Sequence, residues 1–175
     1  QQEEYLKKFD YIFYIDADMR ITDWIGEEVL GEGLTAAEHP MYSLRHNYYP
    51  PYEPNEKSTA YIKRPGRVVT DEIGKQRFKP YYYAGGFQGG RMRHYLRVCS
   101  LLANNIELDK LQGVMAEWHD ETHWNHYLST SAGHNELDPS YCMVEQEHLR
   151  KQWGIDHFEP KLIALAKNHE ELRKA

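Results

Sequence analysis

The sequence predicts a mixed domain, either α/β or α+β, because strand-like and helix-like segments occur together along its 175 residues. Residues 11–15, YIFYI, form a short β-branched and aromatic run of the kind found in buried strands. Residues 92–106 instead place apolar side chains at helical spacing. With 41% hydrophobic and 27% charged residues, the chain has the composition of one globular domain of ordinary size.

The first half of the chain contains four predicted elements and one long excursion. Residues 1–8 predict the end of a helix, and we expect the strand at 11–15 to be buried on both faces. Residues 41–46 are a further strand candidate, and residues 47–83, rich in Pro, Lys and Tyr, are expected to form a long surface excursion. Residues 23–34 predict a second helix, since four apolar residues share one face: Trp24, Ile25, Val29 and Leu30.

A glycine-rich stretch precedes the clearest helix. Residues 81–90, YYYAGGFQGG, hold four glycines within six positions, which lets the backbone pass very close to another group or adopt positive φ. The alternative, which we expect, is a tight bend that packs a strand onto the next helix. A shorter helix is expected to open near residues 119–121, and the segments 147–155 and 161–175 are expected to be helical or irregular. The predicted core stripe of the long helix comprises Met92, Tyr95, Leu96, Cys99, Leu102, Ala103 and Ile106.

Charge and cysteine content argue against several classes of protein. The net charge of −6 and the absence of a Lys/Arg cluster argue against nucleic-acid binding, so an anionic ligand would require a local cation. Cys99 and Cys142 are too few for a disulfide framework and form no CxxC pair, so both are expected to be reduced thiols. No apolar stretch reaches the length of a bilayer span, and residues 1–10 do not resemble a signal peptide. We therefore expect the chain as given to be soluble.

Two carboxylates follow the apolar run 11–15. Asp16 and Asp18 repel each other and are costly to desolvate unless a cation lies between them. Hard divalent cations bind carboxylate oxygens and share substrate phosphates, so a metal and a diphosphate would explain the pair. The alternative is that Asp16 caps a turn and Asp18 is merely exposed. Successive residues of a strand point to opposite faces, and we expect the chain to turn here so that both side chains converge.

A second group of polar residues, AEWHDETHWNHYL, occupies residues 116–128. If Asp120 caps a helix, Glu121 lies in its first turn, where the helix dipole favours an ionised carboxylate. Such a carboxylate in a cleft can act as a nucleophile or stabilise a developing oxocarbenium ion. A simple capping box is the alternative. The HDETH sequence is not a zinc-binding HExxH motif, although His119 and His123 could hydrogen-bond the hydroxyls of a ligand.

These segments together resemble the family 6 glycosyltransferases. The stretches IDADM, PNEKSTAYIKR, YYYAGGFQGG, EWHDETHWNHYL and AKNHEELR, with the helix that contains Cys99, follow the order and approximate spacing of that family. The resemblance implies a GT-A fold, with a Rossmann-like sheet that binds a nucleotide sugar. It also implies Mn²⁺ held by the DxD and retaining α-1,3 transfer of N-acetylgalactosamine or galactose from UDP-GalNAc or UDP-Gal. The implied acceptor is an oligosaccharide or a glycolipid.

The resemblance also implies a role for individual residues. Asp16 and Asp18 match the metal-binding motif, and Glu121 matches the catalytic carboxylate. The residues that match the acceptor-binding positions are His39, Trp118 and His119. The residues that match the donor-binding positions are Asp16, Asp18, Ala84, Gly85, Gly86, Asp120, Lys167 and Arg173. In this pattern Ala84 and Gly86 set the choice of donor sugar, and Lys167 and Arg173 supply local cations for the diphosphate.

The extent of the chain leaves alternatives open. Family members have further catalytic-domain residues before the DxD, including the first strand and the contacts to uracil and ribose. Residues 1–175 therefore resemble the C-terminal portion of a single GT-A domain that lacks its N-terminal strands. One alternative is a non-catalytic carbohydrate-binding remnant, and another is a phosphotransferase with Asp16 as its nucleophile. The resemblance implies a Golgi membrane location for a vertebrate protein and a cytoplasmic or membrane-associated one for a microbial protein.

Overall fold

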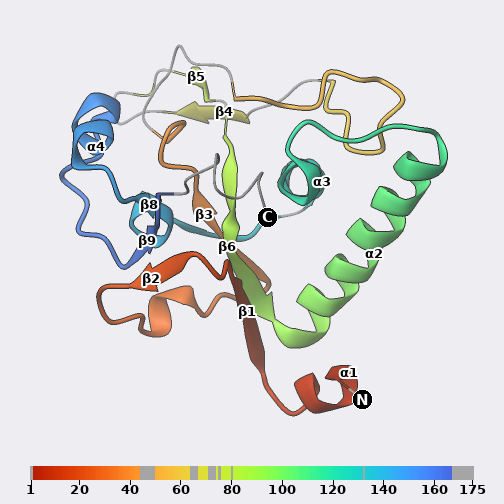
Figure 1. Cartoon of the computed structure of the whole chain (residues 1–175), viewed down its shortest axis with the longest axis horizontal. Helices are drawn as coiled ribbons and strands as arrows, with labels where there is room; N and C mark the ends of the chain where they lie inside the picture. The colour runs from red at the N-terminus through yellow and green to blue at the C-terminus, as the bar shows by residue number, and fades with distance from the viewer. Residues whose placement is uncertain are drawn as a thin grey trace, which may run out of the picture.

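A computed structural model of the chain describes residues 2–43, 50–63, 67–70, 74, 76–79, 81–131 and 133–166. These residues form a mixed α/β arrangement in which a central sheet separates two long helices from a second, smaller sheet (Figure 1). The central sheet has the strand order β1-β6-β3-β7, and the smaller sheet has the order β2-β9-β8. The fold is thus mixed α/β, as the sequence predicts.

Strand β6 (Tyr83–Arg91) lies inside the central sheet and contains the glycine-rich stretch. It pairs antiparallel with β1 (Tyr11–Ile15) on one side and with β3 (Leu34–Glu38) on the other, and β3 pairs parallel with β7 (Asn135–Leu137). A Cβ atom at Gly89 would lie 2.4 Å from the carbonyl oxygen of Ile12, and one at Gly90 would lie 2.2 Å from that of Gly33. The prediction of a bend was therefore wrong, because these glycines let neighbouring strands approach a central strand closely.

Two helices cover one face of the central sheet. Helix α2 (Met92–Leu111) follows β6 directly, and α3 (His119–Thr130) packs beside it, so both helix predictions are confirmed. Their shared core with the sheet consists of Leu34, Ala36, Tyr83, Tyr95, Val98, Leu102, Trp124 and Leu128. The second core cluster consists of Val29, Ala37, Phe87, Leu137, Tyr141 and Leu162.

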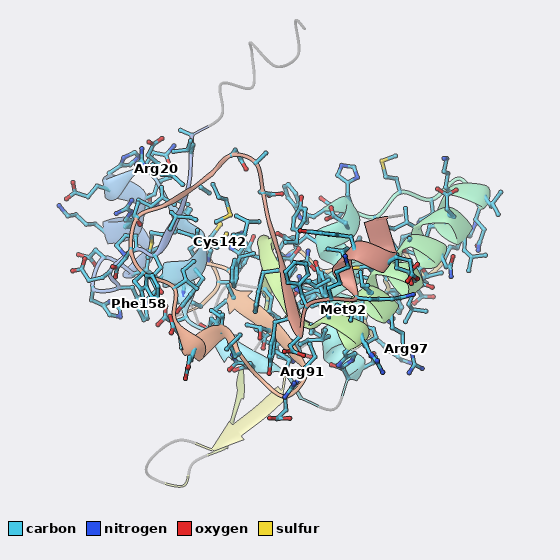
Figure 2. The ribbon with its side chains drawn as sticks, turned by 90° about the horizontal axis from the view of Figure 1, so that it is seen from below. Arg20, Arg91, Met92, Arg97, Cys142 and Phe158 are labelled. Carbon is cyan, nitrogen blue, oxygen red and sulfur yellow. The ribbon has the colours of Figure 1, made fainter. Side chains whose placement is uncertain are left out.

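The smaller sheet joins segments from both ends of the chain. Strand β9 (Leu162–Ala164) pairs antiparallel with β2 (Met19–Ile21) and parallel with β8 (Met143–Val144). The 3₁₀ helix η2 (Pro139–Cys142) precedes β8, and α4 (Glu147–Trp153) follows it. Figure 2 shows Arg20 and Phe158 on the side of this sheet, Met92 and Arg97 on the side of α2, and Cys142 between the two sides.

The remaining elements lie at the periphery. The short helix α1 (Gln2–Leu6) confirms the predicted N-terminal helix and lies beside the end of α2 that follows β6. Strands β4 (Arg67–Thr70) and β5 (Gln76–Lys79) form an antiparallel hairpin within the predicted surface excursion. None of the helices in the described ranges has both the length and the apolar character needed to cross a membrane.

Two further predictions in the first half of the chain were wrong where the structure describes it. Residues 23–34 form no α-helix and include the 3₁₀ helix η1 (Glu27–Val29). Of the four apolar residues, Val29 is buried, but Trp24 is 81% exposed and Leu30 is 45% exposed, so they do not form one buried stripe. Glycines at three positions also lower the helix propensity of this stretch: Gly26, Gly31 and Gly33. In the strand candidate 41–46, the described residues 41–43 form a turn, and the others lie outside the described ranges.

Strands β1 and β9 also differ from what was expected for residues 11–15 and 161–175. The expectation that the strand at residues 11–15 is buried on both faces was wrong, because Phe13 packs against the second core cluster whereas Tyr14, on the opposite face, is 45% exposed. Strand β9 lies in a tail that was expected to be helical or irregular. Its three residues are too few to show a periodicity that would separate a strand from a helix.

Candidate functional site

A pocket of approximately 310 Å³ lies where β1, β6 and α3 meet the smaller sheet. Six of the residues singled out from the sequence line it together, although they come from distant parts of the chain: Asp16, Asp18, His39, Ala84, Gly86 and Glu121. The other lining residues are Met19, Cys142, Val144, Gln146, Ala164, Leu165 and Ala166. No sequence motif indicated this second group as part of the site.

A turn at the end of β1 brings the two aspartates to the same pocket. The backbone N–H of Asp16 donates to the carbonyl of Gly86 at 3.0 Å, which continues the pairing of β1 with β6. The N–H of Met19 then donates to the carbonyl of Asp16 at 3.0 Å and closes the turn. The carbonyl of Asp18 accepts the N–H of Leu165 at 3.0 Å, so the turn is also held by the residues that follow β9. Without this turn, an extended strand would hold the two side chains parallel rather than let both converge on one ligand.

Glu121 is held against the glycine-rich strand. Its Oε2 accepts the backbone N–H of Gly85 at 2.7 Å, and a Cβ atom at Gly85 would lie 3.1 Å from the Cβ of Glu121. Burial raises the pKa of Glu121, and the charges of Asp120 and Asp16 act in the same direction. The Gly85 N–H and the nearby Tyr82 hydroxyl favour the ionised form and oppose this shift. The result is a carboxylate that is fixed in position and more basic than an ordinary glutamate.

The start of α3 has an unusual backbone. His119 has φ of 50°, and it is the non-glycine residue with positive φ in the described ranges. The N-cap position is Trp118, whose N–H donates to the Thr122 hydroxyl at 2.9 Å. The expectation that Asp120 caps this helix was therefore wrong, and Asp120 instead lies with Glu121 in its first turn. Backbone strain of this kind concentrates at functional sites.

His119 and Asp120 line a second pocket, of approximately 220 Å³, between α2 and α3. Asp120 still acts electrostatically on the first pocket, because its charge raises the pKa of Glu121. Trp118 is 51% exposed and lines neither pocket. The structure thus places these three residues at the edge of the site rather than among the residues that surround Asp16 and Asp18.

His39 is a half-buried, neutral member of the first pocket. Its ring lies 4.8 Å from that of Tyr42 and 5.8 Å from that of Tyr82, measured between centroids. Burial lowers the pKa of His39 to about 4, so the ring is uncharged at neutral pH. Its Nδ1 accepts the N–H of Met41 at 3.2 Å, so the proton of the neutral ring lies on Nε2. An Nε2–H group of this kind can donate to a hydroxyl oxygen.

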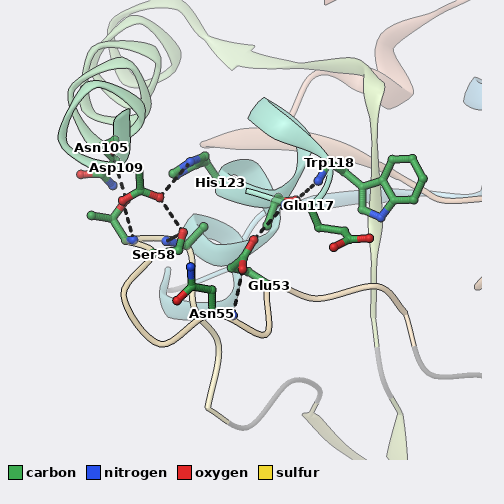
Figure 3. Close-up of polar contacts among 11 residues, drawn as sticks. Glu53, Asn55, Ser58, Asn105, Asp109, Glu117, Trp118 and His123 are labelled. Atoms are coloured by element: carbon green, nitrogen blue, oxygen red, sulfur yellow. Dashed lines mark hydrogen bonds and ion pairs between the residues drawn. The ribbon is translucent and has the colours of Figure 1, made fainter. Parts of the chain in front are cut away.

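A buried polar network supports α3 from the side opposite the sheet (Figure 3). Asp109 of α2 accepts hydrogen bonds from the Ser58 hydroxyl at 2.5 Å and from the Thr59 N–H at 2.8 Å, and its Oδ2 lies 3.7 Å from Nε2 of His123. Glu53 is 4% exposed and accepts the N–H of Glu117, just before α3, at 2.8 Å. Residues 50–63 therefore tie α2 to the segment that leads into Glu121.

The two aspartates fit the cation that the resemblance implies. In the described part of the chain, no three His, Cys, Asp or Glu side chains are grouped so that they could hold a metal by themselves. Cations such as Mg²⁺ and Mn²⁺ are commonly held by one or two carboxylates and completed by water and substrate phosphates. Asp16 and Asp18, which face one pocket, match that incomplete ligand set. Lys167 and Arg173, the predicted partners of the diphosphate, lie outside the described residues.

Both cysteines are free, as expected from their number. Cys99 is partly buried in α2, while Cys142 is buried and lines the pocket. Burial raises the pKa of Cys142 to about 12, and the charges of Glu121, Asp16 and Asp18 add to the effect. The Cys142 thiol is therefore protonated at neutral pH and serves as an apolar wall of the pocket. The sequence carried no signal for this position, because its proximity to the aspartates arises from tertiary structure.

The mixed sheets, the helices on one face and the acidic pocket at a strand end are consistent with a GT-A-like glycosyltransferase domain. The model of glycosyltransferase family 6 matches residues 1–174. The chain therefore belongs to glycosyltransferase family 6, which confirms the resemblance.

Known relatives agree with this assignment. The chain is 32% identical over 176 residues to histo-blood group ABO system transferase 1 of Rattus norvegicus, covering 98% of this chain and 45% of the relative. It is 30% identical over 167 residues to globoside alpha-1,3-N-acetylgalactosaminyltransferase 1 of Gallus gallus, covering 95% and 44%. The human protein of the latter name is 33% identical over 144 residues, covering 81% and 37%. The chain thus spans less than half the length of these relatives.

Proposed function

We propose that the chain forms the metal-binding and catalytic side of a retaining hexosyltransferase site. The reaction is the α-1,3 transfer of N-acetylgalactosamine or galactose from a UDP-sugar to a glycan acceptor. The observation that carries the proposal is the convergence of Asp16, Asp18 and Glu121 on one pocket beside Ala84 and Gly86. Family membership and the activities for which the relatives are named support this reaction class.

The DxD would hold the diphosphate end of the donor. Asp16 and Asp18 would bind a divalent cation, with Mn²⁺ as our assignment, and this cation would offset the negative charge of the departing UDP. The turn that carries the aspartates is fixed by the hydrogen bonds of Asp16 to Gly86 and of Leu165 to Asp18. Such backbone contacts keep both carboxylates in place before the donor arrives, which lowers the entropic cost of binding. Lys167 and Arg173 remain the proposed cationic partners of the phosphates.

Glu121 would act at the anomeric carbon. Retention requires either a covalent intermediate on a carboxylate or attack from the leaving-group face while a carboxylate stabilises positive charge on the sugar. Glu121 is suited to both roles, because the Gly85 N–H fixes its Oε2 and burial excludes much of the water. The raised pKa makes it a better nucleophile or base once ionised. It also predicts that activity falls on acidification at a higher pH than for an ordinary glutamate.

The acceptor would approach from the side of His39 and α3. His39 is neutral and carries its proton on Nε2, so it can hydrogen-bond an acceptor hydroxyl without adding charge beside the sugar. His119 and Trp118, at the start of α3, remain the other proposed acceptor contacts, with Asp120 as a contact to the donor sugar. The exposed Trp118 ring offers an apolar surface of the kind that packs against sugars.

The turnover of a variant at Glu121 provides the test. Purified chain, with UDP-GalNAc or UDP-Gal, Mn²⁺ and a globoside or blood-group-type oligosaccharide as acceptor, is expected to give an α-linked product by NMR. Glu121→Gln should lower turnover by orders of magnitude and leave UDP affinity nearly unchanged. Glu117→Gln is the matched control, because Glu117 is an exposed carboxylate in the same segment. A β-linked product, or near-parental turnover of Glu121→Gln, would contradict the mechanism.

A non-catalytic carbohydrate-binding domain is the second candidate, and the exposed Trp118 ring favours considering it, because such a ring can pack against a sugar. A domain of this kind would bind the glycan acceptor but would neither bind UDP nor turn over a UDP-sugar. Calorimetric titration with UDP and Mn²⁺, beside titration with the acceptor, separates the two functions.

A further inference from the structure

Tyr14 makes a direct contact with the DxD that no sequence motif indicates. Its hydroxyl donates to Oδ1 of Asp16 at 2.6 Å. Tyr14 and Asp16 are two residues apart, and every second residue of a strand lies on one face, so the end of β1 places the phenol beside the first aspartate. The distance is that of a charge-assisted O–H···O⁻ hydrogen bond.

This contact separates the roles of the two carboxylate oxygens of Asp16. Oδ1 is occupied by Tyr14, whereas Oδ2 is directed to Gly86 in the pocket, where an added Cβ would lie 3.2 Å from it. A free aspartate side chain can rotate about its terminal torsion and exchange its two oxygens. The hydrogen bond to Tyr14 favours the orientation in which Oδ2 faces the ligand.

The surroundings of Tyr14 argue against a role in folding alone. Its side chain belongs to neither core cluster of the central sheet, and the residue is 45% exposed. The neighbouring Phe13 points to the opposite face and stacks on Phe87, with ring centroids 5.6 Å apart. The acidic groups that act on the Tyr14 hydroxyl are Asp16, Asp18 and Asp120. A phenol at this position therefore faces the acidic end of the site rather than the hydrophobic core.

We infer that Tyr14 is a positioning residue for the metal-binding aspartate. Its hydroxyl holds Asp16 so that Oδ2 is presented to a divalent cation and to the diphosphate of the donor. The inference rests on the metal-binding part of the proposed function. Partners that orient a metal ligand typically change metal affinity by about 10- to 100-fold when they are removed.

The test compares two tyrosines of the same strand. Tyr14→Phe removes the hydroxyl and keeps the ring, while Tyr11→Phe removes a hydroxyl that donates to the carbonyl of Gly31 at 3.0 Å, at the other end of β1. Mn²⁺ affinity is measured by the electron paramagnetic resonance signal of free Mn²⁺, with UDP present, on the full 175-residue chain. Tyr14→Phe is expected to bind Mn²⁺ about tenfold more weakly, and Tyr11→Phe should match the parent.

The outcomes separate this inference from the proposed function. Equal Mn²⁺ affinity of Tyr14→Phe and the parent, or an equal loss in Tyr11→Phe, would overturn the positioning role and leave the proposed function standing. Failure of the parent to bind Mn²⁺ would overturn both the metal-binding proposal and the role of Tyr14. Normal Mn²⁺ binding without glycosyl transfer would overturn the proposed reaction alone. Where transfer is observed, saturating Mn²⁺ should restore the turnover of Tyr14→Phe, which a distorted fold would not allow.

Discussion

Replacement of Asp109 by alanine is expected to destabilise the chain more than a change at an ordinary polar position. Asp109 is 1% exposed and accepts hydrogen bonds from the Ser58 hydroxyl and the Thr59 N–H. Hydrogen bonds to a charged group contribute about 1.5–3 kcal/mol each, so loss of both should cost about 3–6 kcal/mol. That is a large part of the roughly 5–15 kcal/mol by which domains are usually stable. His123 adds little to this sum at neutral pH, because burial lowers its pKa and 3.7 Å is too long for a hydrogen bond.

Urea unfolding, followed by the fluorescence of tryptophans such as the fully buried Trp124, measures this loss. Glu107→Ala is the matched control, since Glu107 lies on the same helix and forms an exposed ion pair with Lys110 that should contribute less than about 0.5 kcal/mol. Burial opposes the ionisation of Asp109, but its hydrogen bonds to Ser58 and Thr59 outweigh this effect and lower its pKa. The stabilisation should therefore be present above the ordinary aspartate pKa and be lost as pH falls through the lower pKa of the folded state. A loss in Asp109→Ala no larger than that in Glu107→Ala would refute the reasoning.

Four further predictions concern the pocket. Asp18→Asn should abolish the activity that Mn²⁺ restores in the parent, and full activity of the parent in EDTA would contradict a metal role. Glu121→Gln should make the chain more stable at pH 7, because burial raises the pKa of this carboxyl and so penalises its ionised form. The gain should shrink as pH falls through the raised pKa of the folded state and vanish below the ordinary glutamate pKa, and urea unfolding at pH 7 and pH 4 measures both. The parent should use UDP-GalNAc at least as well as UDP-Gal, and Gly86→Ala should shift this preference toward galactose, as measured by kcat/KM for the two donors. The added methyl group would also lie 3.2 Å from Oδ2 of Asp16, so the variant should bind Mn²⁺ more weakly as well. Deletion of residues 167–175 should weaken UDP binding much more than acceptor binding in calorimetry, and equal losses would count against cationic partners in that segment.

Long periodic segments are the part of the fold that the sequence predicts well. Helix α2 is predictable because its apolar residues repeat at helical spacing throughout residues 92–106, and the three most buried members of the predicted stripe are Met92, Tyr95 and Leu102. Residues 23–34 also show apolar residues on one helical face, yet they form mostly irregular structure. The difference is that glycines interrupt this stretch and that Val29 packs in the core from a 3₁₀ turn while Trp24 and Leu30 remain exposed, so no continuous apolar face stabilises a helix.

The site is predictable through chemistry and family motifs rather than through geometry. The motifs assign Asp16, Asp18 and Glu121 to one site, and the fold brings all three to one pocket. Cys142 and the residues after β9 could not be assigned in this way, since they reach the pocket through the pairing of the smaller sheet. Tyr14 was within reach of sequence reasoning, because strand alternation puts it on the face of Asp16. The sequence could not show that the strand with Tyr14 lies at the edge of the described sheet, beside the pocket.

The glycine-rich strand shows why a correct local observation led to a wrong element. Four closely spaced glycines do indicate that the backbone approaches something closely, but a bend and a central strand give the same signal. In β6, Gly89 and Gly90 admit the backbones of β1 and β3, whereas Gly85 and Gly86 leave room for the side chains of Glu121 and Asp16. The first pair lets β1 and β3 approach β6 closely, and the second pair leaves space for the acidic side chains. The same strand therefore builds the sheet and contacts both Asp16, through the Gly86 carbonyl, and Glu121, through the Gly85 N–H.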